Sequence, residues 1–219
     1  MCGRYKQTGA YAELAELFGL VLNGTAYDLQ GAPAMIAPGM VLPALCDGGF
    51  AEMRWGFTPA WSKADSGTDI INARSETLLE KPSFKKAFES QRCLLPANGF
   101  YEWDRSQKPS LPYDIHLPND AGFGLAGIWD QWTDAKTGEI KESFALVTRA
   151  ATPAVAKVHA RMPVILRNLS EYHRWLDATT PLAQLQELFN TPPLDLVLTP
   201  QPRSAKTDLP EDSRQMALF

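Results

Sequence analysis

The chain has 219 residues, of which 45% are hydrophobic and 21% are charged. This composition is close to the average of globular domains, so it excludes a disordered chain and a coiled coil. The formal net charge is −4, which taken alone argues against a general nucleic-acid binder. The three cysteines, Cys2, Cys46 and Cys93, are too few and too scattered for a disulfide framework or a four-cysteine zinc site.

The first residues do not have the pattern of a targeting signal. Positive charge near the start is followed by a Leu- and Val-containing stretch that Glu13 and Glu16 interrupt. No run of 18 apolar residues occurs anywhere in the sequence, so no transmembrane helix is predicted. We therefore expect a cytoplasmic protein, nucleoid-associated if bacterial, that has no membrane partner and whose cysteines remain thiols.

Hydrophobic periodicity and turn residues predict the secondary structure. A short amphipathic helix is expected first, over residues 10–18, and Gly19 ends it. Strands are then expected at residues 41–45, 50–55, 69–73, 92–95, 100–103, 113–117, 123–129, 143–148 and 194–198. Further helices are expected at residues 83–89, 171–176 and 181–189, with Pro181 as the first residue of the last one.

The order of these elements predicts the fold class. The strands cluster in the middle of the chain without a regular alternation with helices, which is unlike a doubly wound parallel sheet. We expect an α+β fold: a single domain with an antiparallel, barrel-like β-sheet core and peripheral short helices. This domain should span residues 1–200, and the polar residues 201–219 should form an extended or loosely ordered tail.

Cys2 is the first candidate for chemistry. If Met1 is removed, Cys2 carries an α-amine and a thiol on adjacent carbons. The amine has an ordinary pKa of about 7.7–8.0, so a fraction of it can form an imine with an aldehyde at neutral pH. The thiol can then close a five-membered thiazolidine ring. The alternative is that Cys2 is an ordinary small residue beside a start methionine. Cys46 and Cys93 are expected to be packed rather than reactive.

An Asn and an Arg form the second candidate pair. In an extended segment Asn72 and Arg74 lie on one face of the strand, since side chains alternate. An amide beside a guanidinium suits an oxygen-rich ligand, and arginine can bind phosphate through two hydrogen bonds. The alternative is a strand end in which Arg74 is a surface residue paired with Glu76.

A carboxylate and a histidine are the candidates for proton transfer. Glu102 lies between aromatic residues, an environment that raises a carboxyl pKa and suits a general acid or base. The alternative is a structural salt bridge. His159 and Arg161 precede Pro163 on a segment expected to be extended, which suits proton transfer beside an anion.

The remaining observations concern metals and charge. Three scattered histidines make a histidine-based metal site improbable, and no metal or cofactor is expected. Residues 81–92 and 149–174 carry an excess of basic side chains, which predicts a basic face on an acidic protein. The aromatic stretch 55–61 could stack on unpaired bases or could be core and turn.

Together these segments resemble one family, the SOS response-associated peptidase (SRAP) domain proteins, which shield abasic sites in single-stranded DNA. The motifs that carry the resemblance are MCGR (1–4), IAPG (36–39), RWGFTPAW (54–61), INARSET (71–77), CLLPANGFYEW (93–103), LAGIWD (125–130) and VHARMPVIL (158–166). They follow the order of the family and cover most of the chain.

The resemblance implies a reaction and the residues that perform it. After loss of Met1, Cys2 would form a thiazolidine with the ring-opened aldehyde of an abasic deoxyribose, which makes a covalent DNA–protein crosslink. Asn72 would position the α-amine or the sugar oxygen, and Glu102 and His159 would carry protons. Members of this family are also proposed to remove their own initiator residue.

The resemblance also implies a DNA-binding surface. Arg4, Arg74 and Arg161 would hold flanking phosphates, while Pro38 and Trp61 would shape the DNA or stack on it. The implied partner is single-stranded DNA with abasic sites, together with replication-fork components, and we expect a monomer.

Two departures and two alternatives accompany the resemblance. Ala34 and Met35 replace an aromatic residue and Asn, and the chain after Pro200 leaves the family pattern, so no function is carried onto that tail.

One alternative function is a cysteine peptidase or amidohydrolase that uses Cys2 with His159. The other is a non-covalent single-strand binder that does not need Cys2.

Overall fold

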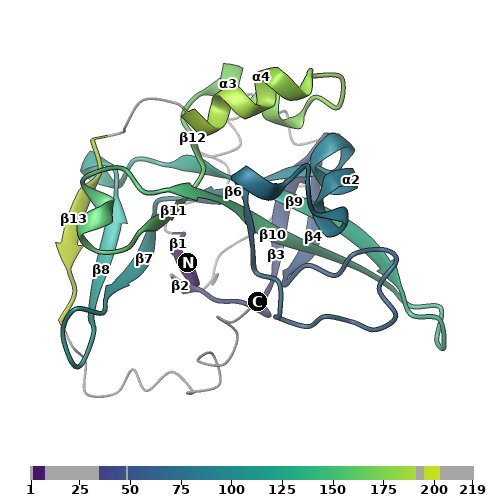
Figure 1. Cartoon of the computed structure of the whole chain (residues 1–219), viewed down its shortest axis with the longest axis horizontal. Coiled ribbons are helices and arrows are strands. Elements are labelled where there is room, and N and C mark those ends of the chain that lie inside the picture. Colours follow the sequence, from purple (N-terminus) through teal and green to yellow (C-terminus); the bar gives the residue numbers. More distant parts are fainter. Residues whose placement is uncertain (1, 8–34, 48, 191–194, 203–219) are drawn as a thin grey trace.

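Two β-sheets and a layer of short helices make up the computed structural model (Figure 1), which describes residues 2–7, 35–47, 49–190 and 195–202. The smaller sheet has the order β13 (Val197–Pro200), β8 (Leu111–His116), β7 (Gly99–Asp104), β1 (Arg4–Lys6) and β2 (Met35–Ile36). The larger sheet contains β3 (Val41–Cys46), β4 (Gly49–Trp55), β5 (Asn72–Arg74), β6 (Arg92–Ala97), β9 (Phe123–Thr133), β10 (Ile140–Ala150), β11 (Arg161–Pro163) and β12 (Ile165–Leu166).

The larger sheet closes on itself. Pairing runs from β10 through β4, β3, β6 and β9 and returns to β10, so these strands form a ring without a free edge. The expected α+β fold with a barrel-like core and peripheral short helices is therefore confirmed. Most pairings are antiparallel, but β10 also pairs in parallel with β4 and β5.

Most predicted strands lie where the pattern placed them. The strand expected at 69–73 begins only at Asn72, because the preceding residues form a loop in which the Ile70 carbonyl oxygen accepts from the Phe57 amide. The last strand begins at Val197 rather than at residue 194. Four strands of two or three residues, namely β1, β2, β11 and β12, are too short to produce an alternating pattern and were not predicted. The helix expected at 10–18 lies outside the described residues.

The helices cover one side of the larger sheet (Figure 1). They are α2 (Pro82–Ser90), α3 (Leu169–Leu176) and α4 (Leu182–Glu187), with short 3₁₀ turns η1 (Ser75–Thr77), η2 (Pro118–Asp120), η3 (Val155–Lys157) and η4 (Leu188–Asn190). Helix α2 begins with proline, whose fixed φ suits a first turn, and it buries Phe84, Ala87 and Phe88 at helical spacing. Pro181 caps α4 instead of being its first residue.

Apolar side chains form two clusters. One lies between the barrel and the helices and includes Phe88 and Trp175. The other combines residues of both sheets, among them Tyr5, Trp55 and Phe100. Cys93 is fully buried in this second cluster, and burial raises the pKa of the half-buried Cys46 to about 12. Both thiols are therefore held in their neutral form at ordinary pH, as expected of packed cysteines.

The predicted basic face is reduced by pairing inside the fold. Arg92 is buried and donates to the backbone carbonyls of Phe88 and Trp175, which are located at the ends of two helices. Arg167, which is partly exposed, pairs with the buried Glu171. Counting charges along the sequence therefore overestimated the basic surface, because the count could not identify which cations have partners.

None of the described helices is long and apolar enough to cross a membrane.

Candidate functional site

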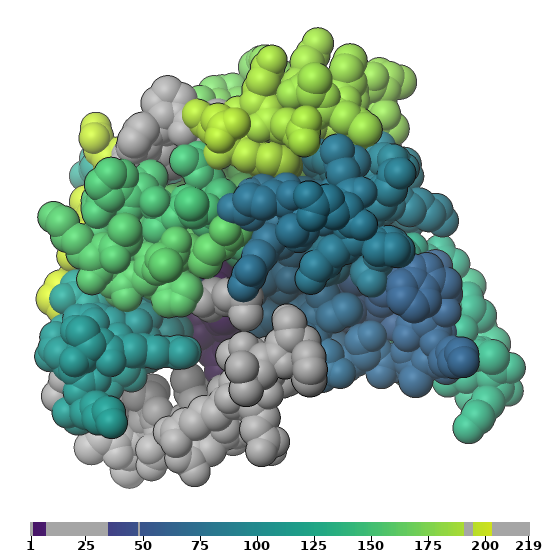
Figure 2. Space-filling view, in the orientation of Figure 1, coloured from purple at the N-terminus to yellow at the C-terminus, as the bar shows by residue number. Residues whose placement is uncertain are grey.

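Cys2 lies just before β1, the strand held between β7 and β2 in the smaller sheet. Its side chain is fully buried, and its thiol donates to the Arg4 carbonyl oxygen at 3.5 Å. Burial raises the pKa of the Cys2 thiol well above its ordinary value, and the nearby Glu102 carboxylate raises it further. The thiol is thus neutral at ordinary pH. In Figure 2 the purple atoms of the N-terminal segment are visible at the bottom of a hollow on this face.

Asn72 connects the N-terminal segment to the larger sheet. Its strand, β5, pairs in parallel with β10, and this pairing places Asn72 beside Leu146. The Asn72 Nδ2 atom donates to the Cys2 carbonyl oxygen at 2.9 Å. The buried Oδ1 atom of the same amide has no hydrogen-bond partner among the described residues. A buried acceptor without a partner is costly, so this atom is available to a donor group of a ligand.

Glu102 and His159 face each other across the site. The Glu102 side chain is 4% exposed, and its Oε1 atom lies 3.7 Å from His159 Nδ1. Burial raises the pKa of the Glu102 carboxyl group, and the charge of His159 opposes this shift. The strand β7 that carries Glu102 pairs with β1, which places the carboxyl group close enough to Cys2 to affect its thiol. A carboxyl group with a raised pKa is suited to proton transfer near neutral pH.

The backbone of Arg161 provides partners for both protonation states of His159. Nδ1 lies 3.1 Å from the Arg161 amide nitrogen and 3.1 Å from its carbonyl oxygen. A neutral ring with its proton on Nε2 accepts from the amide, whereas a protonated ring donates to the carbonyl. The imidazole is thus held in one orientation whether or not Nδ1 carries a proton, as a proton-carrying group requires.

The arginines predicted to hold phosphates differ in how they are paired. The guanidinium of Arg161 binds both carboxylate oxygens of Glu76, at 2.5 and 2.9 Å, and donates to the Thr148 carbonyl oxygen at 2.7 Å. The exposed Arg74 side chain makes no ion pair or hydrogen bond with a described residue. The alternative pairing of Arg74 with Glu76 is therefore wrong, since Arg161 takes Glu76 as its partner.

Arg4 resembles Arg74 in having no described carboxylate partner. It is half-buried beside Cys2 and donates to the Gly3 carbonyl oxygen at 2.6 Å. Burial lowers the pKa of its guanidinium, which means that its charge is poorly compensated in the described structure. An anion that binds here would compensate this charge.

The two residues predicted to contact DNA through their rings lie on neighbouring loops. Pro38 is part of the turn between β2 and β3, while Trp61 lies on the loop after β4 and is 67% exposed. The turn that contains Pro38 is bonded to the end of β4, where the Gly39 amide donates to the Trp55 carbonyl oxygen at 2.8 Å. The exposed ring indicates that Trp61 is not part of the core.

The structure thus brings Cys2, Asn72, Glu102 and His159 together, with Arg4 beside Cys2. Glu76 and Thr148 were not predicted as site residues. The spacing of 85 residues between Glu76 and Arg161 gives no local signal of their contact. Among the described residues, no three His, Cys, Asp or Glu side chains converge in a way that could hold a metal ion.

The class of protein follows from this fold and from a match across most of the chain. Residues 1–202 match the family described as SOS response associated peptidase (SRAP). The chain therefore belongs to the SRAP family.

Individual relatives are similar to it over most of its length. Abasic site processing protein YoaM of Bacillus subtilis is 32% identical over 182 residues, which are 81% of this chain and 79% of the relative. Abasic site processing protein HMCES of Gallus gallus is 33% identical over 161 residues, 63% of this chain and 48% of the relative. A crystal structure of a Bacteroides thetaiotaomicron protein has the same fold, with a TM-score of 0.82, 24% identity and coverage of 92% and 93% of the two chains.

Proposed function

We propose that this protein traps abasic sites in single-stranded DNA by forming a thiazolidine between Cys2, after loss of Met1, and the aldehyde of the ring-opened sugar. The observation that carries the proposal is a chain of contacts that begins at Cys2: Asn72 donates to its carbonyl oxygen, the Glu102 carboxylate acts on its thiol, and His159 lies beside Glu102. The names of the relatives, which are abasic site processing proteins, support the choice of substrate.

The proposed reaction forms two bonds and releases one water molecule. The Cys2 α-amine attacks the aldehyde carbon, and the resulting carbinolamine loses its hydroxyl group as water to give an imine. The thiol sulfur then adds to the imine carbon, and the thiol proton passes to the nitrogen. Attack by the amine comes first in this scheme, because the buried thiol is held in its neutral form.

Each neighbouring residue has a proposed part in these steps. The Glu102 carboxyl group donates the proton that lets the sugar ring oxygen, and later the carbinolamine hydroxyl, depart. His159 takes up and returns protons as the amine and the thiol react. Asn72 holds the Cys2 carbonyl with its Nδ2 atom, so its partnerless Oδ1 atom is directed to accept from the α-amine or a sugar hydroxyl.

A cysteine peptidase that uses Cys2 with His159 is disfavoured by the surroundings of the thiol. Peptidase thiolates form where a cation lowers the thiol pKa. Here burial and a carboxylate raise the pKa of Cys2. A non-covalent single-strand binder would not require a buried carboxyl group that acts on the Cys2 thiol and lies beside His159.

The test uses single-stranded oligonucleotides of one sequence with and without an abasic site. The proposal predicts a denaturant-resistant protein–DNA band with the abasic oligonucleotide only. A band of equal strength with both oligonucleotides, or with neither, would contradict it.

Replacing Arg74 with alanine is expected to weaken binding to single-stranded DNA and to flatten its dependence on salt. Each phosphate contact on a single strand contributes about −0.7 to the slope of log K against log salt concentration, so one lost contact should make the slope shallower by about that amount. Fluorescence anisotropy at several salt concentrations measures both quantities. Arg174→Ala is the matched control, since Arg174 lies on α3 and pairs with Glu187. An unchanged slope for Arg74→Ala would remove it from the phosphate contacts.

Replacing Glu76 with glutamine is expected to strengthen binding to single-stranded DNA several-fold. In the parent protein the Glu76 carboxylate neutralises Arg161, and the variant removes that negative charge. Glu76 is 50% exposed, and the Arg161 guanidinium holds its pKa down at about 2, so it stays ionised at neutral pH. Thr148 continues to hold the guanidinium in place when the carboxylate is absent. Anisotropy of the variant against Glu187→Gln as control measures the effect. Weaker binding of Glu76→Gln would mean that Glu76 orients Arg161 rather than competing with DNA.

A further inference from the structure

The loop between β4 and β5, residues 56–71, presents Trp61 and Lys63 as exposed side chains. Its two ends are held together closely. A β-carbon at Gly56 would lie 2.2 Å from the Gly67 carbonyl oxygen, so no larger residue fits there. Beyond its last residues the chain enters β5, the strand that carries Asn72 and Arg74.

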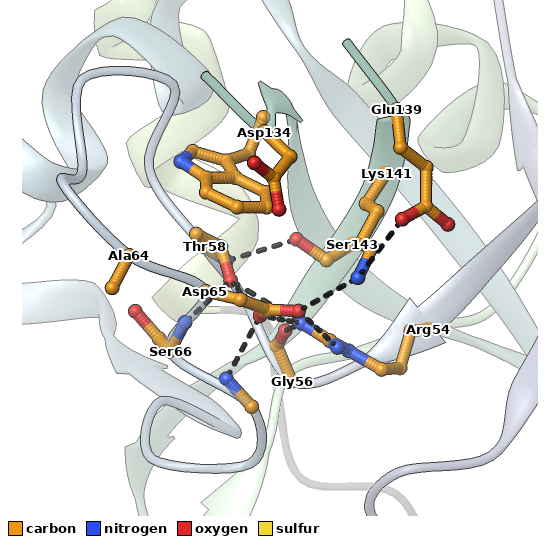
Figure 3. A network of polar contacts seen from close by, with 12 residues as sticks. Arg54, Gly56, Thr58, Ala64, Asp65, Ser66, Asp134, Glu139, Lys141 and Ser143 are labelled. Atoms are coloured by element: carbon orange, nitrogen blue, oxygen red, sulfur yellow. Dashed lines mark hydrogen bonds and ion pairs between the residues drawn. The ribbon is translucent and has the colours of Figure 1, made fainter. Parts of the chain in front are cut away.

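The Asp65 carboxylate is the centre of the contacts inside this loop (Figure 3). Both of its oxygens accept from the guanidinium of Arg54, which lies on β4. The distance from Arg54 Nη1 to Asp65 Oδ2 is 2.8 Å. The carboxylate also accepts from the Thr58 hydroxyl at 3.0 Å and from the Gly67 amide at 2.9 Å, and Lys141 lies 3.6 Å away. The hydrogen bonds with Arg54 hold the pKa of Asp65 well below its ordinary value, so the carboxylate keeps its charge.

Both chain neighbours of Trp61 are fixed to strand β9. The Ala60 amide donates to Asp130 Oδ2 at 2.7 Å, and Trp132 Nε1 donates to the Ser62 carbonyl oxygen at 2.8 Å. Trp61 itself remains 67% exposed. The backbone is therefore hydrogen-bonded to β9 on each side of Trp61, while the indole ring of Trp61 is exposed to solvent. An exposed indole of this kind does not contribute to the core.

We propose that Asp65 is a positioning residue that, through its pair with Arg54, holds Trp61 as a preformed stacking surface for a base of the bound single strand. The inference rests on the proposed function and adds to it the device that makes the stacking contact rigid. Aromatic rings bind bases of any sequence by stacking. A ring that is already held in place loses less conformational entropy when a base binds.

Asp65→Asn and Trp61→Ala, alone and combined, test the proposal by anisotropy with a single strand that has no abasic site. Each single change should weaken binding about tenfold, the size expected for one stacked base. The double variant should bind no more weakly than either single variant, because Asp65 acts through Trp61. Asp177→Asn is the matched control: this carboxylate also caps a loop, by accepting from the Thr179 amide at 2.8 Å, but it follows α3.

Two further readouts separate positioning from general damage. Hydrogen–deuterium exchange of residues 57–68 should rise in Asp65→Asn and stay unchanged in Asp177→Asn. The rate of crosslinking at saturating abasic DNA should equal that of the parent, since the reaction centre is intact. If Asp65→Asn does not fold, Trp132→Phe removes the N–H donor to Ser62 together with part of the buried indole ring, and it should weaken DNA binding in the same way.

Parent-like binding by Asp65→Asn, or losses that add in the double variant, would overturn the inference. A lower crosslinking rate at saturation would also overturn it, because Asp65 would then act on the reaction centre. The binding experiments do not involve the covalent step, so a parent that fails to crosslink contradicts the proposed function and leaves these outcomes readable.

Discussion

Replacing Cys2 with alanine is expected to abolish the denaturant-resistant band formed with abasic single-stranded DNA. The variant keeps the α-amine but has no thiol to close the ring, so its adduct stops at the imine, which hydrolyses. Borohydride, which reduces an imine to a stable amine, should therefore restore a covalent band in Cys2→Ala. Denaturing gels run with and without borohydride measure both results.

Cys46→Ala is the control for this experiment, because it removes a half-buried thiol that the reaction does not use. It should crosslink like the parent without reductant. If Cys2→Ala formed the band as well as the parent in the absence of borohydride, the thiazolidine mechanism would be wrong.

Replacing Glu102 with glutamine is expected to slow crosslinking by about 10²–10⁴-fold, the usual contribution of a general acid or base. Glutamine keeps the shape of the side chain and cannot donate the proton. The parent rate should depend on pH as a bell, because the reaction needs the α-amine without its proton and the Glu102 carboxyl group, whose pKa is raised by burial, with its proton. The variant should keep the rising part and lose the falling part.

The same substitution is expected to stabilise the fold at neutral pH, which separates slow chemistry from misfolding. Folding raises the pKa of Glu102, so the folded state binds the carboxyl proton more tightly than the unfolded state does. This contribution to stability is fully present below the unfolded-state pKa and is lost as pH rises through the folded-state pKa. Glutamine does not ionise, and thermal unfolding at pH 7 should therefore occur at a higher temperature in Glu102→Gln. The exposed Glu52 provides the control variant Glu52→Gln, which should match the parent in rate and stability. Parent-like crosslinking by Glu102→Gln would exclude it as the proton donor.

The sequence predicted the elements whose own residues determine them. The hairpin of β3 and β4 follows from two short runs of strand character with a glycine-containing turn between them, and α2 follows from apolar residues at helical spacing. Strands β11 and β12 have three and two residues, and their pairing with β10 and β9 defines them. Such short strands depend on distant neighbours, so a local pattern could not reveal them.

In the candidate site, too, the sequence predicted individual residues but not their long-range contacts. Cys2, Asn72, Glu102 and His159 were named from local chemistry, and the fold brings them together. Which arginine pairs with Glu76 could not be predicted, because the pairing joins segments that the chain order does not relate. The Asp65 contacts were also missed, since an aspartate in a polar loop resembles an ordinary surface residue until Arg54 is seen beside it.

The central claim is that the bond to DNA forms at Cys2 after Met1 has left. The most direct measurement is mass spectrometry of the crosslinked protein after nuclease and trypsin digestion. We expect the sugar remnant on the peptide Cys2–Arg4, with no Met1 and with both the amine and the thiol blocked. A remnant on a lysine side chain, or on a peptide that still begins with Met1, would contradict it.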